Sequence, residues 1–352
     1  MSVIPDPRIY YVFRCVTCGN GNKPCAHTIN YLKERDITIV DQNPDIILVS
    51  YNAGPDIEQE KRLINLLNGN VPVIVCERND AASSHLLSTH TKSHTINTIH
   101  PHLHKIAGVF KNFVLRPKEL FNEPTILSRY HYYMLKGLHP EYKDDHPVTP
   151  VNDLSPEILS KIHAVPWHIR GSFMGKSYEP LRKQNIDFSQ HRSVDVMCSI
   201  SIVFASYYKF HRKLCLKTLN QLPSNIKKVV HSLGKPQYYR TMQNAKICVS
   251  PYGLGEFGHR DYEAIYCGAL LIKPDCSHVE TWPDIYQENK TYISCKPDYS
   301  DLNEIIQRVL ANYDDYTEIR KNARSMLMNT NRHLLLDYMC NKIKDIYDSS
   351  TS

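Results

Sequence analysis

Apolar and polar positions along this chain follow a pattern typical of parallel β-sheets covered by helices. In the first half, runs that are apolar on both faces fall at residues 9–15, 45–50, 71–76 and 106–115. Stretches with apolar residues at helical spacing lie between them, at 26–34 and 55–67. Strands that are buried on both faces show such continuous apolar runs. The first half therefore predicts a parallel sheet with helices on both sides.

The same alternation restarts in the second half. Strands are expected at residues 194–203, 227–233, 247–250 and 269–273, and helices at 207–222, 235–245, 259–267, 302–312 and 316–349, the last broken near Asn329. Between 141 and 166 the pattern weakens and prolines cluster, which indicates a linker. We therefore expect an α/β fold with two Rossmann-like domains, at 1–155 and 156–335, and a C-terminal helix at 336–352 that packs back on the first.

Composition narrows the functional classes. The chain has 352 residues, 42% of them apolar and 22% charged, and a formal net charge of +6. The densest basic stretch, at 209–217, is short, so we expect no nucleic-acid partner. No leader pattern and no apolar run of about 18 residues is seen, which favours a cytoplasmic protein without a membrane span and leaves peripheral association open. A composition leaning to Asn, Lys, Tyr and Ile suggests that the chain is virus- or bacterium-encoded.

Residues 250–263, SPYGLGEFGHRDYE, carry the clearest chemical signal. A strand ends at the start of this segment, and Gly253, Gly255 and Gly258 allow a tight turn and close approach to a ligand. A helix then begins, and its N-terminal amides form a site for a diphosphate. Arg260 adds a charged fork suited to phosphate oxygens, and Glu263 lies one turn later, where it could accept hydrogen bonds from ribose hydroxyls.

The segment from 229 to 274 resembles the donor half of GT-B glycosyltransferases, both the group 1 retaining enzymes and the exostosin-like and CgeB-like sets. The shared parts are Leu233-Gly234, a helix at 238–245, a strand at 247–251, the Glu256-Phe257-Gly258 loop, Glu263-Ala264, Gly268 and an apolar strand ending at Pro274. The resemblance is tight over about 45 residues, loose over the rest of the second half, and hardly extends to the first half.

This resemblance implies that Glu263 binds the donor ribose, residues 253–258 hold the diphosphate and sugar, and the backbone at 233–235 contacts the base. Retaining members place seven residues between their two glutamates, whereas six lie between Glu256 and Glu263 here, so the stereochemical outcome stays open. The expected donor-binding set is Lys209, Arg212, Gly234, Lys235, Tyr252, Gly253, Gly255, Glu256, Phe257, Gly258, Arg260, Glu263 and Lys273.

These residues together favour a glycosyltransferase that moves a hexose or pentose from a UDP- or GDP-sugar to an acceptor hydroxyl of a glycan or glycoconjugate, with no cofactor. A non-catalytic nucleotide-sugar-binding protein and a GT-B-type epimerase are the alternatives. No Asp-x-Asp motif is present, which favours metal-independent stabilisation of the leaving group. The oligomeric state stays open.

Weaker signals lie in the first half. Asp80 follows a strand end and is the candidate general base of an inverting reaction, with Glu77 close behind and Glu256 as the other catalytic candidate. Cys15, Cys18, Cys25 and His27 have imperfect zinc-ligand spacing and are better explained as a plain loop. The histidines at 85, 90, 94, 100, 102 and 104 favour a polar loop over a metal site.

Overall fold

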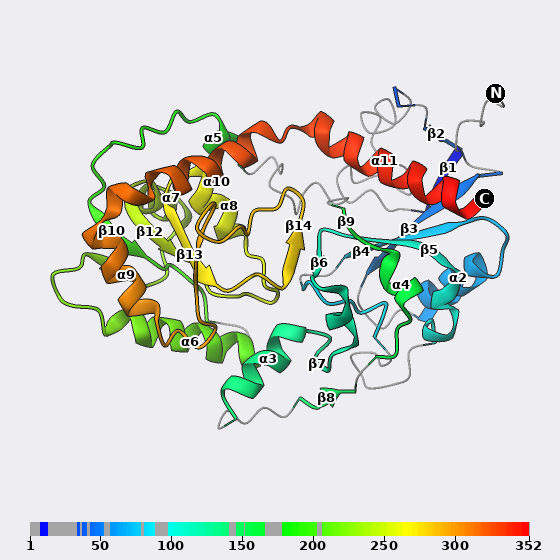
Figure 1. Ribbon diagram of the computed structural model, residues 1–352, viewed down its shortest axis with the longest axis horizontal. Coiled ribbons are helices and arrows are strands. Elements are labelled where there is room, and N and C mark those ends of the chain that lie inside the picture. The colour runs from blue at the N-terminus through cyan, green and yellow to red at the C-terminus, as the bar shows by residue number, and fades with distance from the viewer. Residues whose placement is uncertain are drawn as a thin grey trace.

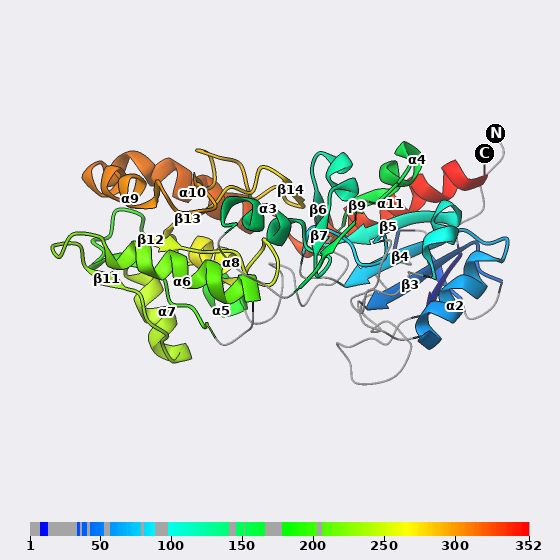
Figure 2. The same cartoon turned by 90° about the horizontal axis from the view of Figure 1, so that it is seen from below.

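A computed structural model describes residues 8–12, 34–35, 37–40, 43–52, 57–78, 81–88, 98–140, 146–150, 152–165, 178–202 and 206–351. Two sheets lie at opposite ends of an elongated molecule, and short strands and a helix fill the space between them (Figures 1 and 2). The expected α/β class with two parallel sheets is confirmed.

The first sheet has six parallel strands in the order β2-β1-β3-β4-β5-β9. Their bounds are Arg8–Val12 (β1), Thr38–Ile39 (β2), Ile46–Asn52 (β3), Val73–Arg78 (β4), Ile106–Lys111 (β5) and Ile162–Ala164 (β9). Successive residues of β3 lie on opposite faces of the sheet. Ile47 and Val49 belong to the core that contains Leu63 of α2 (Ile57–Leu67). Ile46 and Leu48 instead pack with Leu336, Met339 and Ile343 of α11 (Arg332–Thr351).

The second sheet has five parallel strands in the order β11-β10-β12-β13-β15. They span Val194–Met197 (β10), Lys228–Val229 (β11), Ala245–Val249 (β12), Leu270–Pro274 (β13) and Ile293–Cys295 (β15). One face packs on α6 (Ser206–Asn220) and α9 (Leu302–Ala311), and the other on α7 (Lys235–Gln243), α8 (His259–Tyr266) and α10 (Thr317–Asn329).

The core between the second sheet and helices α7, α8 and α10 continues into the first half without a break. One cluster of buried side chains runs from Val75 and Phe113 through Tyr132 and Tyr207 to Cys248. The shared core means that the two halves are packed together where their sheets approach one another.

Two connections cross between the halves at the same place. Strand β6 (Phe113–Leu115) pairs antiparallel with β14 (Val279–Thr281). Helix α11 runs from the second half to the first, as the red helix of Figure 1 shows. Trp282, directly after β14, stacks on Tyr338 of α11 with ring centroids 4.7 Å apart and planes 10° apart. We call this group of contacts the joint.

The remaining described elements are short. They are α3 (Tyr130–Leu138), α4 (Pro156–Ser160), α5 (Glu179–Arg182), the antiparallel pair β7 (Thr125–Ile126) and β8 (Val148–Thr149), and the 3-10 turns His100–Lys105, Lys118–Asn122 and Tyr313–Tyr316. None of the described helices is long and apolar enough to cross a membrane.

The structure differs from the sequence-based expectations at four places. The stretch expected as a linker contributes α4 and β9, so the first sheet extends to Ala164, past the boundary expected at 155. Its apolar run, Ile162–Ala164, is too short to show a strand period. The expected strand at 106–115 divides into β5 and β6. The strand expected at 194–203 ends at Met197, and the strand expected at 227–233 is limited to Lys228–Val229. The helix expected at 26–34 lies almost wholly outside the described residues.

Candidate functional site

A glycine-rich loop, residues 250–258, follows β12 at the carboxyl edge of the second sheet. In this sheet β10 is flanked by β11 on one side and β12 on the other, so the chain order reverses beside β10. Open parallel sheets bind ligands outside the carboxyl ends of the strands at such a switch point. The amide of Gly253 donates to the carbonyl of Gly255 at 2.8 Å and tightens the turn, and Gly258 is the N-cap of α8. The loop therefore lies where this architecture places a ligand.

Asp261 holds the loop and the start of α8 in place. Its side chain is completely buried and accepts hydrogen bonds from the Ser250 hydroxyl, the Gly258 amide at 3.1 Å and the Tyr286 hydroxyl at 2.6 Å. The ammonium of Lys273, also completely buried, lies 3.2 Å from the same carboxylate. The structure thus places Lys273 in an ion pair beneath the loop.

Two arginines approach the loop from different helices. Arg212 on α6 is buried, and its guanidinium donates to the carbonyls of Ser201 at 2.7 Å and Tyr252 at 3.4 Å. A Cβ added at Gly253 would lie 3.5 Å from its Nη2. Arg260 is on the first turn of α8, and among the described residues its buried Nε has no hydrogen-bond partner.

These two cations repel one another. Burial lowers the pKa of Arg212 to about 10, and the charge of Arg260 adds to that effect. Neither arginine takes part in the ion pairs found among the described residues, whereas a buried charge is ordinarily paired. The pair therefore creates a positive site beside the glycine-rich loop that an anion would neutralise.

Glu263, on the second turn of α8, is held by two tyrosines of α7. The Tyr238 hydroxyl donates to Glu263 Oε2 at 2.6 Å, and the Tyr239 hydroxyl donates to Oε1 at 2.9 Å. All three side chains are partly buried. The carboxylate expected to bind a ribose is therefore fixed on both oxygens by its own neighbours.

Glu256 joins the loop to the first half of the chain. Its side chain is completely buried, and Oε2 accepts from the Ala82 amide at 2.9 Å. Oε1 lies 3.2 Å from His131 Nδ1 on α3 and 3.8 Å from His278 Nε2. Burial lowers the pKa of His131 more than the neighbouring carboxyl group raises it, so this imidazole is neutral.

The backbone beneath Glu256 is strained. Leu127 and Ser128, just before α3, have φ values of 53° and 56°, in the left-handed region. The Ser83 hydroxyl donates to the Ser128 carbonyl at 2.8 Å and holds this turn against residues 81–88. Arg129 follows the turn and donates from Nε to the carbonyl of Leu254, at the tip of the glycine-rich loop. Such conformations cost about 1–3 kcal/mol each and persist where packing enforces them.

Glu77, an alternative general base from the sequence, is occupied by structural contacts. Its buried carboxylate accepts from the Ser84 hydroxyl at 2.6 Å and the amides of His85 at 2.6 Å and Leu86 at 3.3 Å, and lies 3.2 Å from Lys111 Nζ. These contacts order residues 81–88 and leave it little capacity for a substrate proton. Asp80 and the candidate zinc ligands Cys15, Cys18, Cys25 and His27 lie outside the described residues.

Three arginines secure the far end of α8. Arg324, Arg192 and Arg320 donate to the carbonyls of Tyr266, Cys267 and Gly268 respectively. Cations at a helix C-terminus interact favourably with its dipole. Gly268 has φ +67°, and a Cβ there would lie 2.7 Å from Ile186, so no other residue fits this turn without strain.

The remaining predicted donor residues divide between core and surface. Tyr252 is completely buried, stacks on His211 and donates to the Asp275 carbonyl. Phe257 packs on Phe113 of β6 with ring centroids 5.7 Å apart. Gly234, the N-cap of α7, is exposed, as are Lys235 and Lys209. The sequence signalled neither the tyrosine pair nor His131 and His278, because their roles depend on how distant elements pack.

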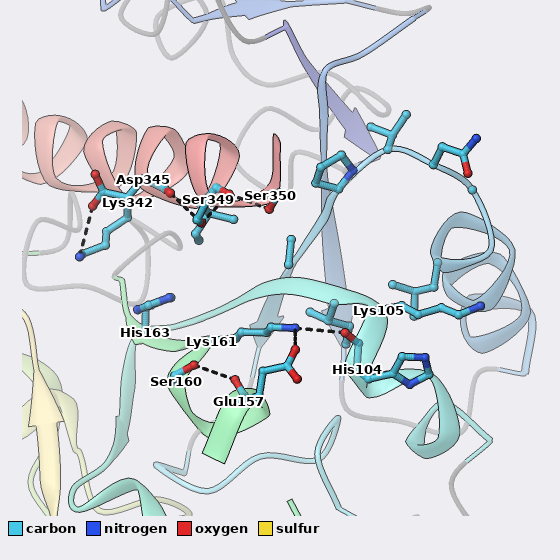
Figure 3. A pocket seen from close by; sticks show the side chains of 18 of the residues that line it. His104, Lys105, Glu157, Ser160, Lys161, His163, Lys342, Asp345, Ser349 and Ser350 are labelled. Atoms are coloured by element: carbon cyan, nitrogen blue, oxygen red, sulfur yellow. Dashed lines mark hydrogen bonds and ion pairs between the residues drawn. The ribbon is translucent and has the colours of Figure 1, made fainter. Parts of the chain in front are cut away.

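A separate surface hollow of about 850 Å³ lies at the opposite, amino-terminal edge of the first sheet. It is bounded by the C-terminal part of α11, residues 67–72 and the turn between α4 and β9 (Figure 3). Two ion pairs lie along it, Lys161 with Glu157 at 2.8 Å and Lys342 with Asp345 at 3.5 Å, and the ammonium of Lys105 donates to Asn68 Oδ1 at 2.8 Å. Each of its three lysines therefore has a side-chain partner, whereas Arg260 Nε beside the glycine-rich loop has none among the described residues.

No protein-family model and no curated protein matches this chain. Among solved structures, it is similar to S. aureus TarM at 11% identity, with a TM-score of 0.45 over 92% of this chain and 58% of that one. It is similar to sucrose-phosphate synthase from Thermosynechococcus elongatus at 12% identity, with a TM-score of 0.47 over 87% of this chain and 74% of that one. An alpha-glucosyltransferase in complex with UDP and a 13-mer DNA containing a HMU base is similar at 10% identity, with a TM-score of 0.43 over 99% and 100%.

The chain thus spans less than two thirds of the length of TarM. Similarity at this level leaves open what the present chain binds, which has to be argued from the site. Within the described residues no group of three or more His, Cys, Asp and Glu is arranged to hold a metal ion.

Proposed function

We propose that this protein is a glycosyltransferase that moves a sugar from a nucleoside-diphosphate sugar to a hydroxyl of a glycan or glycoconjugate. The observation that carries the proposal is the pair of cations, Arg212 and Arg260, beside a glycine-rich loop and a helix N-terminus at a sheet switch point. A diphosphate supplies the negative charge and the several acceptor oxygens that this arrangement lacks.

The chemistry follows from that charge balance. When the bond between the sugar and the diphosphate breaks, negative charge grows on the leaving phosphate. Arg212 is held by hydrogen bonds to backbone carbonyls before substrate arrives, and Arg260 is carried by the first turn of α8, so they stabilise that charge with little reorganisation. This stabilisation requires no metal ion, in keeping with a metal-independent reaction.

The nucleoside occupies the neighbouring helix start. Glu263 accepts the ribose hydroxyls, and the backbone at 233–235 contacts the base. Support comes from Leu233, whose amide donates to the Ser199 hydroxyl at 3.0 Å, which fixes the turn before α7. Gly234 and Lys235 are exposed at that turn and are accessible to a base. Either a UDP- or a GDP-sugar would satisfy these contacts.

Three predicted residues take supporting roles in this proposal. Lys273 neutralises Asp261 beneath the loop, and Tyr252 fills the core beside it. Glu256 fastens the loop to residues 81–88 and does not face solvent in this arrangement. Asp80, which follows β4 in the sequence, remains the candidate base of this proposal, and the first half of the chain would hold the acceptor.

The test is a thermal-shift panel of UDP-, GDP-, TDP- and CMP-sugars, with and without EDTA. A ligand that binds the folded state raises the melting temperature by mass action. We expect one donor to stabilise the wild type in EDTA and to fail on Glu263→Ala, while the exposed control Glu304→Ala retains the response. A flat panel would contradict the proposal.

A second assay separates the proposal from its alternatives. Incubation of the identified donor with candidate glycan acceptors should yield a new glycoside by mass spectrometry. A protein that binds the donor without turnover is a binding protein. One that releases or rearranges the sugar with no acceptor product behaves as an epimerase.

A further inference from the structure

The two tyrosines on Glu263 are arranged as a matched pair. They are consecutive where the first turn of α7 passes into the second, and each contacts a different oxygen of one carboxylate. Their rings meet edge to face, with centroids 5.3 Å apart. Consecutive helical side chains ordinarily diverge by about 100°, so their convergence on one group requires α7 and α8 to pack in this register.

The carboxylate retains capacity for a ligand despite these bonds. An ionised carboxylate has about four acceptor positions, and the tyrosines use one on each oxygen. Burial and the neighbouring Glu263 raise the pKa of Tyr239, and burial raises that of Tyr238, so both phenols remain neutral donors. One acceptor position on each oxygen is left for a second donor, which matches the two vicinal hydroxyls of a ribose.

The two tyrosine hydrogen bonds also restrict rotation of the Glu263 carboxylate, a motion that would weaken ligand binding. A partly exposed glutamate rotates about its terminal torsion, which is broad and roughly two-fold. Two anchored oxygens restrict that rotation before the ligand arrives, and preorganisation strengthens binding by lowering the ordering cost. We propose that Tyr238 and Tyr239 are positioning residues that aim Glu263 at both hydroxyls of a ribose, so that the site selects ribonucleotides over deoxyribonucleotides.

This inference rests on the proposed donor site, and the experiment distinguishes the two. Isothermal titration would measure the affinity of UDP and GDP and of their 2′-deoxy and 3′-deoxy counterparts. The proteins are the wild type, Tyr238→Phe, Tyr239→Phe and the double variant, in which the rings remain and only the hydroxyls are lost. Tyr313→Phe is the matched control, because its hydroxyl donates to the Lys246 carbonyl at 3.1 Å, outside the loop.

The wild type should bind the ribonucleotide about tenfold or more tightly than either deoxy form, as expected for hydrogen bonds to a charged group. The double variant should reduce that ratio to about threefold or less. Its affinity for the deoxy forms should stay within about twofold of wild type, because a ligand that lacks one hydroxyl makes fewer hydrogen bonds to the Glu263 carboxylate. The control should retain the full ratio.

Three results would overturn the inference. An equal loss for ribo and deoxy ligands would mean that the tyrosines only support the fold. Tighter ribonucleotide binding by the variants would mean that the hydroxyls compete with the ribose. A wild type that binds nucleotides without preferring ribose would leave the donor site standing and remove the role of the tyrosines. If the wild type binds no nucleotide, the proposed function itself fails.

Discussion

Two buried acid–lysine pairs organise the facing edges of the two sheets, and they do so with opposite results. In the first half, Glu77 of β4 pairs with Lys111 of β5. In the second, Asp261 of α8 pairs with Lys273 of β13. Both ammonium groups are at most 1% exposed, and both carboxylates also accept hydrogen bonds from a neighbouring loop.

The two pairs differ in how completely they bind the neighbouring loop and in the charges that stand beside it. Glu77 accepts the amides and hydroxyl of its own loop, so residues 81–88 are closed upon it. Asp261 fixes only the two ends of its loop, at Ser250 and Gly258, and neither Arg212 nor Arg260 beside that loop forms an ion pair among the described residues. A buried acid–lysine pair thus closes the loop at the edge of the first sheet, whereas at the edge of the second sheet it leaves a positive site that can bind an anion.

Lys111→Met tests the first pair and should have the largest effect. It leaves Glu77 buried without its cation, which costs about 3–5 kcal/mol of the free energy of unfolding. Urea denaturation measures the loss, and titration with UDP or GDP should show unchanged affinity in the protein that remains folded. Restored stability in Glu77→Gln/Lys111→Met would confirm that the uncompensated charge is the cause, and weakened nucleotide binding would contradict the contrast.

Lys273→Met is the corresponding change in the second half. We expect a similar loss, about 3–5 kcal/mol, for the same reason. Here nucleotide affinity should also fall, because Asp261 no longer holds the loop ends in a fixed relation. Comparison of the two lysine variants at matched urea concentrations sharpens the contrast. If both leave nucleotide affinity intact, the second pair has no special relation to the site.

Arg260→Ala should separate function from stability. Loss of one charge-stabilising donor lowers turnover by about a hundredfold. The melting temperature should change little, because the lost repulsion with Arg212 offsets the lost attraction of Arg260 to Asp261. Lys217→Ala, on the exposed face of α6, is the control for net charge. A large fall in melting temperature together with unchanged turnover would show that Arg260 serves the fold.

Acid should weaken the first half through His163, on β9. Burial, with Lys118 and Lys342 nearby, lowers its pKa to about 4, against about 6.5 in an unfolded chain. Between these values the unfolded chain binds a proton that the folded chain does not, so stability is full above pH 6.5 and falls toward pH 4. At pH 5 the loss is about 2 kcal/mol.

His163→Gln should flatten this acid limb in urea midpoints measured at pH 7.5 and 5. The exposed His231→Gln is the control and should keep the wild-type slope. An unchanged slope in His163→Gln would show that other groups govern acid stability.

The glycine-rich segment could be predicted from sequence because its signals are local. A strand end, three glycines and a helix start lie within residues 250–263, and the structure has each of these. The break of the last helix near Asn329 was predicted for the same reason, and α10 ends there. Short apolar runs that alternate with helical stretches similarly predicted the two sheets.

The partners of the key carboxylates could not be predicted in this way. In the sequence, Glu77 has the position of a candidate general base at a strand end. In the structure it forms an ion pair with Lys111, one strand away in the sheet. The tyrosines on Glu263 lie 24 and 25 positions earlier in the chain. Ala82, which binds Glu256, is 174 positions away. Such contacts follow from packing, which single-sequence patterns do not encode.

The joint has a mechanical consequence for how the facing edges could part. The β6–β14 ribbon and the crossing of α11 are held together by the stack of Trp282 on Tyr338, so a rotation between the halves would turn about both together. A body turning about a single pivot moves least beside it and most at the far rim. Phe257, packed on β6, lies near the axis, whereas the contact of Arg129 with Leu254 is made by the loop tip. On opening, the contact at that loop tip would therefore separate first. Helix α8 would move as a rigid unit, because three arginines bind the carbonyls at its C-terminal end.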